Sequence, residues 1–74
     1  MTHAYAVVIE RAADNYAAYV PDLPGVIATG ETVEQTMQEI GEAISLFLEE
    51  AAASGDEVPP PATHVTYIGV STAA

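Results

Sequence analysis

The run Pro21–Ile44, PDLPGVIATGETVEQTMQEIGEAI, constrains the fold of this chain more than any other part of it. Pro21 and Pro24 fix φ near about −65° and remove two backbone donors, while Gly25 permits the backbone angles of a sharp reversal. The segment Val26–Gly30 that follows favours a short strand. The run therefore predicts a turn and a strand that lead directly into a helix.

The start and the end of that helix are marked by capping residues. Thr32 and Gln35 have the spacing of a capping box, in which each side chain satisfies a backbone amide at the helix start. Ser54 and Gly55 provide the end, since glycine commonly terminates helices. We predict a helix from about Val33 to about Ala53.

The flanking segments predict three further strands. An apolar run within Thr2–Arg11, centred on Tyr5–Glu10, is the first strand, and Tyr16–Val20 is the second. Asp14 and Asn15 between them are turn residues, so the two strands should form an antiparallel hairpin. After the helix, Pro59–Pro61 makes a stiff lead into a fourth strand, Val65–Val70. The single domain spans residues 1–70, and residues 71–74 form a tail.

The helix has an apolar stripe and an acidic opposite face. The stripe, expected to lie on the sheet, consists of Val33, Met37, Ile40, Ile44, Phe47, Leu48 and Ala51. The opposite face carries Gln35, Gln38, Glu39, Glu42, Ser45, Glu49 and Glu50, and among them stands Leu46. This leucine is either an isolated exposed residue, which is common, or an apolar anchor for a basic partner or another subunit.

The sheet is apolar on both faces. In the first strand Tyr5, Val7 and Ile9 share one face and Ala4, Ala6 and Val8 share the other, while the fourth strand sets Val65 and Tyr67 against Ile68 and Val70. One helix covers only one face, and a chain of 74 residues has a marginal core. The pattern predicts a homo-oligomer, a dimer or a higher even-numbered assembly.

Composition restricts the partners and the compartment. Eleven carboxylates and one arginine give a net charge of −10, which makes nucleic acid a poor direct partner. The acidity either attracts a basic protein or serves solubility alone. Cysteine is absent, and the N-terminus shows neither a signal peptide nor a membrane span. We expect a cytoplasmic protein.

The PDLPG turn, the TGET sequence at Thr29–Thr32, the long acidic helix and the segment Gly55–Pro61 together resemble the HicB-type antitoxin family. The resemblance implies an α+β, partial RNase H-like fold of order β-β-β-α-β, in which three antiparallel strands form a meander and the fourth lies parallel to the first. It implies an antitoxin that neutralises a small basic mRNA-cleaving toxin of HicA type. Many longer members carry a DNA-binding segment after this domain, which we expect to be absent here.

The functional hypotheses name specific residues. For toxin binding we predict contacts from Asp22, Leu23, Pro24, Glu39, Glu42, Leu46 and Glu49. Asp22 is alternatively a brace for its own turn. A second hypothesis is an oligomeric binding module without a toxin. A third is a degenerate metal-dependent nuclease that would use carboxylates such as Glu10, Asp22 and Glu31.

Catalysis and metal binding are not the favoured expectations. The first two of those carboxylates would meet only if the hairpin register allowed it, and no basic groove is available for RNA. His3 and His64 each precede an apolar strand, but two imidazoles are too few for a closed zinc site. We predict a protein that is not an enzyme and has no cofactor and no metal.

Overall fold

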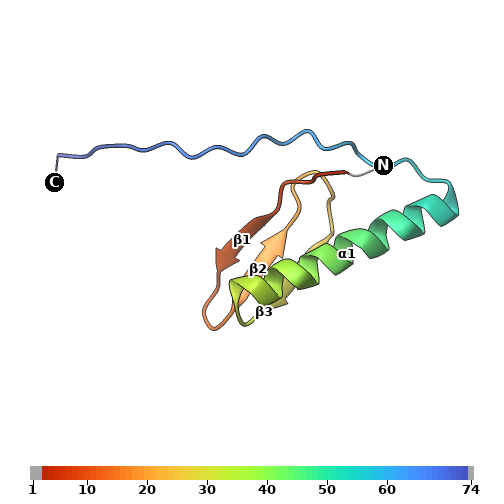
Figure 1. Cartoon of the computed structure of the whole chain (residues 1–74), viewed down its shortest axis with the longest axis horizontal. Helices are drawn as coiled ribbons and strands as arrows, with labels where there is room; N and C mark the ends of the chain where they lie inside the picture. Colours follow the sequence, from red (N-terminus) through yellow and green to blue (C-terminus); the bar gives the residue numbers. More distant parts are fainter. Residues whose placement is uncertain (1–2, 74) are drawn as a thin grey trace.

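The computed structural model describes residues 3–73 and consists of three strands followed by one long helix (Figure 1). The strands are β1 (Val8–Arg11), β2 (Tyr16–Tyr19) and β3 (Ile27–Gly30), and the helix is α1 (Val33–Ser54). The predicted α+β class is confirmed for this part of the fold. β1 begins three residues later than the predicted Tyr5, and the other boundaries differ by one residue at most.

The sheet is the predicted antiparallel meander, with strand order β1-β2-β3. Val8 pairs with Tyr19 and Tyr19 pairs with Ile27, so one residue from each strand lies in a single row across the sheet. The hairpin is closed by a hydrogen bond of 2.8 Å from the Ala12 amide to the Asn15 carbonyl. The two outer strands, β1 and β3, leave their far edges open in the described chain.

Both predicted caps of α1 are confirmed. The Gln35 amide donates to Thr32 Oγ1 at 3.0 Å, and the Glu31 amide donates to Gln35 Oε1 at 2.8 Å. At the other end Gly55 has φ 72°, in the left-handed region that glycine adopts without strain. Capping residues that are recognisable in the sequence therefore set both ends of α1.

The core lies between α1 and one face of the sheet. Its buried members are Ala18, Val20, Leu23, Val26 and Ile40, with Tyr5, Val7, Ile9, Ala28, Ala43, Ile44 and Phe47 packed around them. The assignment of Tyr5, Val7 and Ile9 to one face is confirmed. On the opposite, open face, Tyr19 and Ile27 are exposed apolar side chains, as expected of a sheet that is apolar on both sides.

The predicted helix stripe is wrong at its beginning. Val33 and Met37 are exposed, whereas Thr36, which the periodicity places off the stripe, is fully buried. Its hydroxyl donates to the Thr32 carbonyl at 2.7 Å, so the buried oxygen is satisfied. Gly30 makes this approach possible, because a Cβ there would lie 2.5 Å from Thr36 Oγ1. The first helical turn therefore meets the sheet through Gly30 and Thr36.

The predicted fourth strand is wrong for the single chain. Residues Val65–Val70, called the arm below, are extended but do not pair with β1 or with any other strand of residues 3–73. In Figure 1 the arm runs away from the sheet. The radius of gyration is 14.8 Å, compared with about 11 Å expected for a compact chain of this length. Of the predicted order β-β-β-α-β, the three strands and the helix are thus present within residues 3–73, and the fourth strand is not.

No helix within residues 3–73 combines the length and hydrophobicity that crossing a bilayer requires.

Candidate partner-binding surfaces

Asp22, a predicted contact residue, holds the chain that precedes the arm. Its Oδ2 accepts hydrogen bonds from the amides of Ala62 and Thr63, both at 3.0 Å, and its Oδ1 accepts from the Thr63 hydroxyl at 2.9 Å. The bond from the Ala62 amide contributes most to lowering the pKa of this carboxyl, with a smaller opposing effect from desolvation. Asp22 therefore braces a segment distant in sequence rather than its own turn, which backbone bonds close.

The other two predicted turn contacts differ in their exposure. Leu23 is 0% exposed and is one of the largest buried side chains of the core, whereas Pro24 is exposed. Leu23 can therefore support a binding surface only from beneath. Two backbone hydrogen bonds close the turn around this leucine: the Leu23 amide donates to the Val20 carbonyl at 3.0 Å, and the Val26 amide donates to the Leu23 carbonyl at 3.2 Å.

Leu46 stands beside an apolar groove and not alone on the acidic face. It is 56% exposed and lines a hollow of about 200 Å³ between α1 and β3. We call this hollow the β3-side groove; it is lined by Gly25, Val26, Ile27, Ala43, Leu46, Phe47 and Glu50. Ile27 is 70% exposed at its rim. Leu46 is thus a large, exposed apolar side chain beside a groove that the described chain leaves open, while the Ile27 side chain belongs to the open face of the sheet with Tyr19.

The predicted acidic contacts surround this leucine on the helix. Glu39, Glu42 and Glu49 are all exposed, and positions three, four and seven residues apart share one side of a helix. Glu42 accepts a hydrogen bond of 3.3 Å from Gln38 Nε2. The structure therefore brings Leu46 and these three glutamates onto one surface of α1. Asp22 lies in a different part of the chain, in the turn between β2 and β3.

A second acidic hollow was missed by the sequence analysis. It has a volume of about 550 Å³ and lies at the end of α1, where it is lined by Phe47, Glu50, Ala51, Ser54, Asp56 and Glu57. It shares Phe47 and Glu50 with the β3-side groove. The C-terminus of a helix carries partial negative charge, so these carboxylates reinforce it. The signal in the sequence was the pair Asp56-Glu57 immediately after the helix-ending Gly55.

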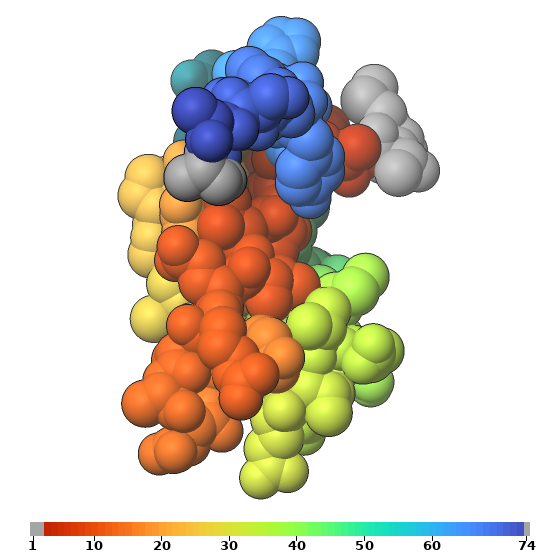
Figure 2. Space-filling model, turned by 90° about the vertical axis from the view of Figure 1, so that its left-hand side faces the viewer, coloured from red at the N-terminus to blue at the C-terminus, as the bar shows by residue number. Residues whose placement is uncertain are grey.

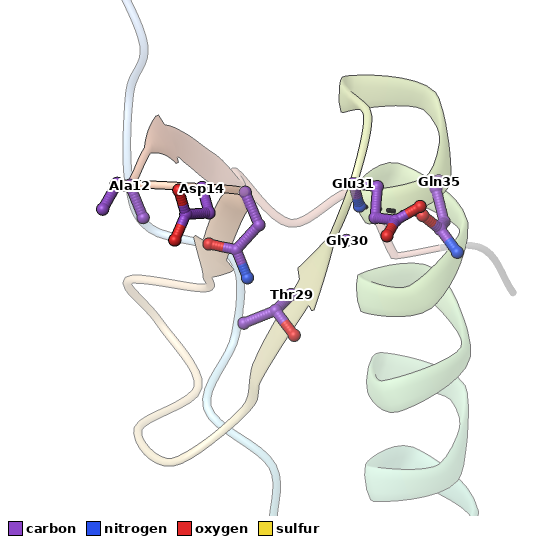
Figure 3. A pocket seen from close by; sticks show the side chains of 8 residues that line it. Ala12, Asp14, Thr29, Gly30, Glu31 and Gln35 are labelled. Atoms are coloured by element: carbon purple, nitrogen blue, oxygen red, sulfur yellow. Dashed lines mark hydrogen bonds between the residues drawn. The ribbon is translucent and has the colours of Figure 1, made fainter.

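A third hollow, also missed, lies between the β1–β2 hairpin and the start of α1 (Figure 3). Its volume is about 660 Å³, and its lining residues are Ala12, Ala13, Asp14, Asn15, Thr29, Gly30, Glu31 and Gln35. Gln35 is already engaged by the Glu31 amide. The lining of this hollow is more polar than that of the β3-side groove, and it includes the acidic residues Asp14 and Glu31.

The fourth hollow is apolar and lies on the other side of the helix. It has a volume of about 250 Å³ between the β1 strand and α1. We call it the β1-side groove; it is lined by Val7, Ile9, Met37, Ile40, Gly41 and Ile44, none of which is charged. The helix is thus flanked by two open apolar grooves, one with an acidic rim and one without.

The residues considered for catalysis are not brought together. Within residues 3–73 no group of three or more His, Asp or Glu side chains is arranged to hold a metal ion. The His3 ring lies 6.2 Å from the Tyr5 ring, centroid to centroid. The nuclease hypothesis therefore has no cluster of carboxylates to support it in the described chain.

Comparison with known proteins identifies the family. The model of the HicB-like antitoxins of bacterial toxin–antitoxin systems matches residues 5–71. The chain belongs to this family. The resemblance drawn from the turn, cap and helix motifs is thereby confirmed, and the match extends through the arm. No solved structure matches the chain.

Several curated proteins are similar to this HicB-like chain. A UPF0150 protein from Synechocystis is 32% identical over 71 residues, which cover 95% of this chain and 97% of that protein. A second Synechocystis UPF0150 protein is 39% identical over 56 residues, or 74% of this chain and 71% of its own length. An uncharacterized protein of Haemophilus phage HP1 is 36% identical over 55 residues, which are 74% of this chain but only 41% of the phage protein.

Proposed function

We propose that this HicB-like chain is an antitoxin that binds and neutralises a small basic RNA-cleaving toxin of HicA type. Family membership supports the general role, since the family is defined by toxin–antitoxin systems. The observation that carries the specific proposal is the β3-side groove, where exposed Leu46 lies beside the acidic surface of α1. The chain acts by binding and not by catalysis.

The charge distribution supports a basic protein as the partner. The chain carries eleven carboxylates and one arginine, and that arginine lies over the Tyr16 ring, 5.3 Å from its centroid. A surface of this kind attracts lysine and arginine side chains and accelerates encounter. It repels phosphate, so the partner is a protein and not a nucleic acid.

The same surface suggests how neutralisation works. An enzyme that cleaves RNA binds the phosphate backbone through basic side chains. The carboxylates of Glu39, Glu42 and Glu49 would pair with those side chains while Leu46 fills an apolar contact in the centre of the interface. RNA and the antitoxin then compete for one surface. On this proposal the toxin and the antitoxin act in the cytoplasm, where mRNA is found.

The test is co-purification of the chain with the product of the adjacent gene, followed by an RNA-cleavage assay. We expect a complex that suppresses cleavage in proportion to the antitoxin added. Leu46→Asp should weaken the complex by about tenfold or more, because it places a charge in the apolar centre. Leu46→Met is the matched control and should retain binding. Glu42→Lys should weaken the complex, whereas Glu10→Lys on β1, away from α1, should not.

A second function is favoured by the unpaired arm. If the chain assembles with itself but leaves the neighbouring gene product unbound and active, it is an oligomeric binding module without a toxin. Binding that is unchanged by both Leu46→Asp and Glu42→Lys would place the toxin interface elsewhere on the molecule.

A further inference from the structure

We infer that the arm, Val65–Val70, pairs with the open edge of β1 in a second copy of this chain and fills that copy's β1-side groove. The exchange is reciprocal in a twofold symmetric dimer. This inference does not rest on the proposed toxin, since it uses a different edge of the sheet and a different side of the helix.

The edge of β1 is free to accept a strand. The bond from the Ala12 amide to the Asn15 carbonyl marks a bonded pair of the β1–β2 ladder. Bonded and non-bonded pairs alternate along an antiparallel ladder, so the backbone groups of Glu10 and Val8 face β2 and those of Ile9 face outward. An open row of donors and acceptors is a template for another strand.

The β1-side groove lies directly beside this edge. Val7 and Ile9 from β1 and its preceding residue form one wall, and Met37, Ile40, Gly41 and Ile44 from α1 form the other. Met37 is 58% exposed, and apart from neighbouring backbone of the same helix no heavy atom lies within 4 Å of the position a Cβ on Gly41 would take. A strand added to β1 would place every second side chain in this space.

The arm has the chemistry of the missing strand. Its large apolar residues are nearly uncovered: Val65 is 66%, Tyr67 94%, Ile68 79% and Val70 78% exposed. Six extended residues span about 20 Å, enough to run along the edge from Val7 to Arg11. Residues 58–70 contain no Asp, Glu, Lys or Arg, so the arm suits an uncharged groove and offers nothing to a basic partner.

The residues just before the arm, Pro59 to Thr63, form its base, and hydrogen bonds hold this base against the rest of the chain. Asp22 binds the amides of Ala62 and Thr63, and the Tyr5 hydroxyl donates to the Pro59 carbonyl at 2.6 Å. These contacts hold the base of the arm against the residues that precede β1 and follow β2. Beyond them the arm runs away from its own sheet (Figure 1). In Figure 2 the blue arm lies at the top, and the orange hairpin at the bottom is not covered by it.

A second copy of the chain can both cover the arm and fill the open edge of β1 together with the groove beside it. Each chain presents one uncovered strand and one empty place for such a strand, so two copies satisfy each other through the same contacts repeated twice. Burial of the two large apolar side chains of each arm that face the groove, either Val65 and Tyr67 or Ile68 and Val70, supplies the driving force. Exchange of an identical element in this way costs little, because the contacts are those a closed chain would make.

The experiment compares full-length variants by sedimentation velocity and native mass spectrometry. The arm variant is Tyr67→Asp with Ile68→Asp, so that one charge faces the groove whichever side chain enters it. Its matched control, Ser71→Asp with Ala73→Asp, adds the same charge beyond the arm. The groove variant is Gly41→Leu, which fills the groove from its own helix, and its matched control is Gly41→Ala.

We expect the wild type and both controls to be dimers and the arm and groove variants to associate at least about tenfold more weakly. Mixing the arm variant with the groove variant restores one intact arm in one intact groove. Native mass spectrometry should then detect a heterodimer of the two variants under conditions in which neither variant alone forms a homodimer.

Two results would overturn the inference. A wild-type monomer whose arm amides are protected from hydrogen exchange would show that the arm closes on its own β1. A dimer that survives the Tyr67→Asp, Ile68→Asp substitutions with unchanged affinity would show that the copies meet elsewhere, for example through Tyr19 and Ile27 on the open face.

Discussion

At the scale of single residues, Asp22 joins the turn after β2 to the segment before the arm. The residue type is evident from the sequence, but its partners lie 40 and 41 positions away, and no local pattern reveals a contact of that separation. The same holds for the Tyr5 hydroxyl and the Pro59 carbonyl. Both contacts depend on the path of the chain after α1.

Asp22 gives a prediction for acid conditions. Its pKa is lowered below the ordinary 3.8 because the Ala62 and Thr63 amides favour the charged carboxylate. A carboxyl with a lowered pKa in the folded state stabilises that state above the unfolded pKa, and the effect is lost as the pH falls through the lowered value. Below pH 3.8 we therefore expect the base of the arm to detach progressively, with faster hydrogen exchange at both amides.

A two-dimensional NMR titration of the Ala62 and Thr63 amides measures this detachment. Asp22→Asn is the control, because it retains one carbonyl acceptor and removes the titrating group. In that variant the acid-dependent step at the two amides should disappear. If the step persists unchanged, another carboxyl controls the base of the arm.

Gly30 gives a prediction about packing. A Cβ at this position would lie 2.5 Å from Thr36 Oγ1 and 2.8 Å from the Thr36 backbone nitrogen. The backbone atom cannot move without shifting the first turn of α1, so Gly30→Ala should lower the free energy of unfolding by about 1–3 kcal/mol. Urea denaturation at a fixed protein concentration measures the change.

The matched control is Gly41→Ala, at a helical position where the added Cβ meets no heavy atom within 4 Å other than neighbouring backbone of the same helix. Alanine is the better helix former, so this variant should be more stable than the wild type by about 0.5–1 kcal/mol. Equal effects of the two substitutions would contradict the close approach of Gly30 and Thr36.

At the scale of elements, the sequence predicts the sheet and the helix well because their signals are local. Thr32, Gln35 and Gly55 fix the ends of α1, and Asp14 and Asn15 mark the hairpin. Burial within the helix is less predictable. Thr36 is buried because Gly30 lies opposite it, and Leu46 belongs to a groove because the start of β3 and the turn before it form the other wall. Both facts depend on how α1 crosses the sheet.

The fourth strand is the element that local patterns predict wrongly. Val65–Val70 has the composition of a strand, and it is extended in the structure. A strand also needs a partner, and composition does not tell whether that partner belongs to the same chain. The candidate site divides in the same way: the acidic face of α1 is predictable from periodicity, whereas the two grooves beside the helix are formed by residues from separate elements.

The cap of α1 gives a prediction at this scale. Thr32 Oγ1 accepts from the Gln35 amide at 3.0 Å, so Thr32→Ala leaves that amide without its partner and should cost about 1 kcal/mol of stability. Thr32→Ser keeps the hydroxyl and should stay close to the wild type. Thermal unfolding followed by circular dichroism measures both, and equal stability of the alanine and serine variants would show that the cap contributes nothing.

At the scale of the whole molecule, a net charge of −10 on 74 residues acts on every association of this chain. Two copies repel each other, whereas a basic partner is attracted from a distance. The proposed surfaces follow this division. The β3-side groove lies beside the acidic face of α1, and the arm and the β1-side groove carry no charged side chain.

The two proposed associations should therefore respond to salt in opposite directions. Raising NaCl shortens the Debye length from about 10 Å at 0.1 M to about 3 Å at 1 M. This screening weakens attraction between the acidic helix and a basic toxin, so the Kd of that complex should rise. It also weakens repulsion between two acidic copies while leaving apolar burial intact, so the Kd of the homodimer should fall.

Sedimentation equilibrium of the chain alone and of the complex, over one NaCl series, measures both constants. NaCl is preferable to sulfate, because sulfate strengthens apolar burial whatever the charge. The variant with Ser71→Asp and Ala73→Asp is a useful control, since its added charges should steepen the salt dependence of self-association without blocking the arm. A homodimer that weakens with NaCl would instead be held by ion pairs, for which Arg11 is the only lysine or arginine the chain offers, and the exchange of arms would lose its physical basis.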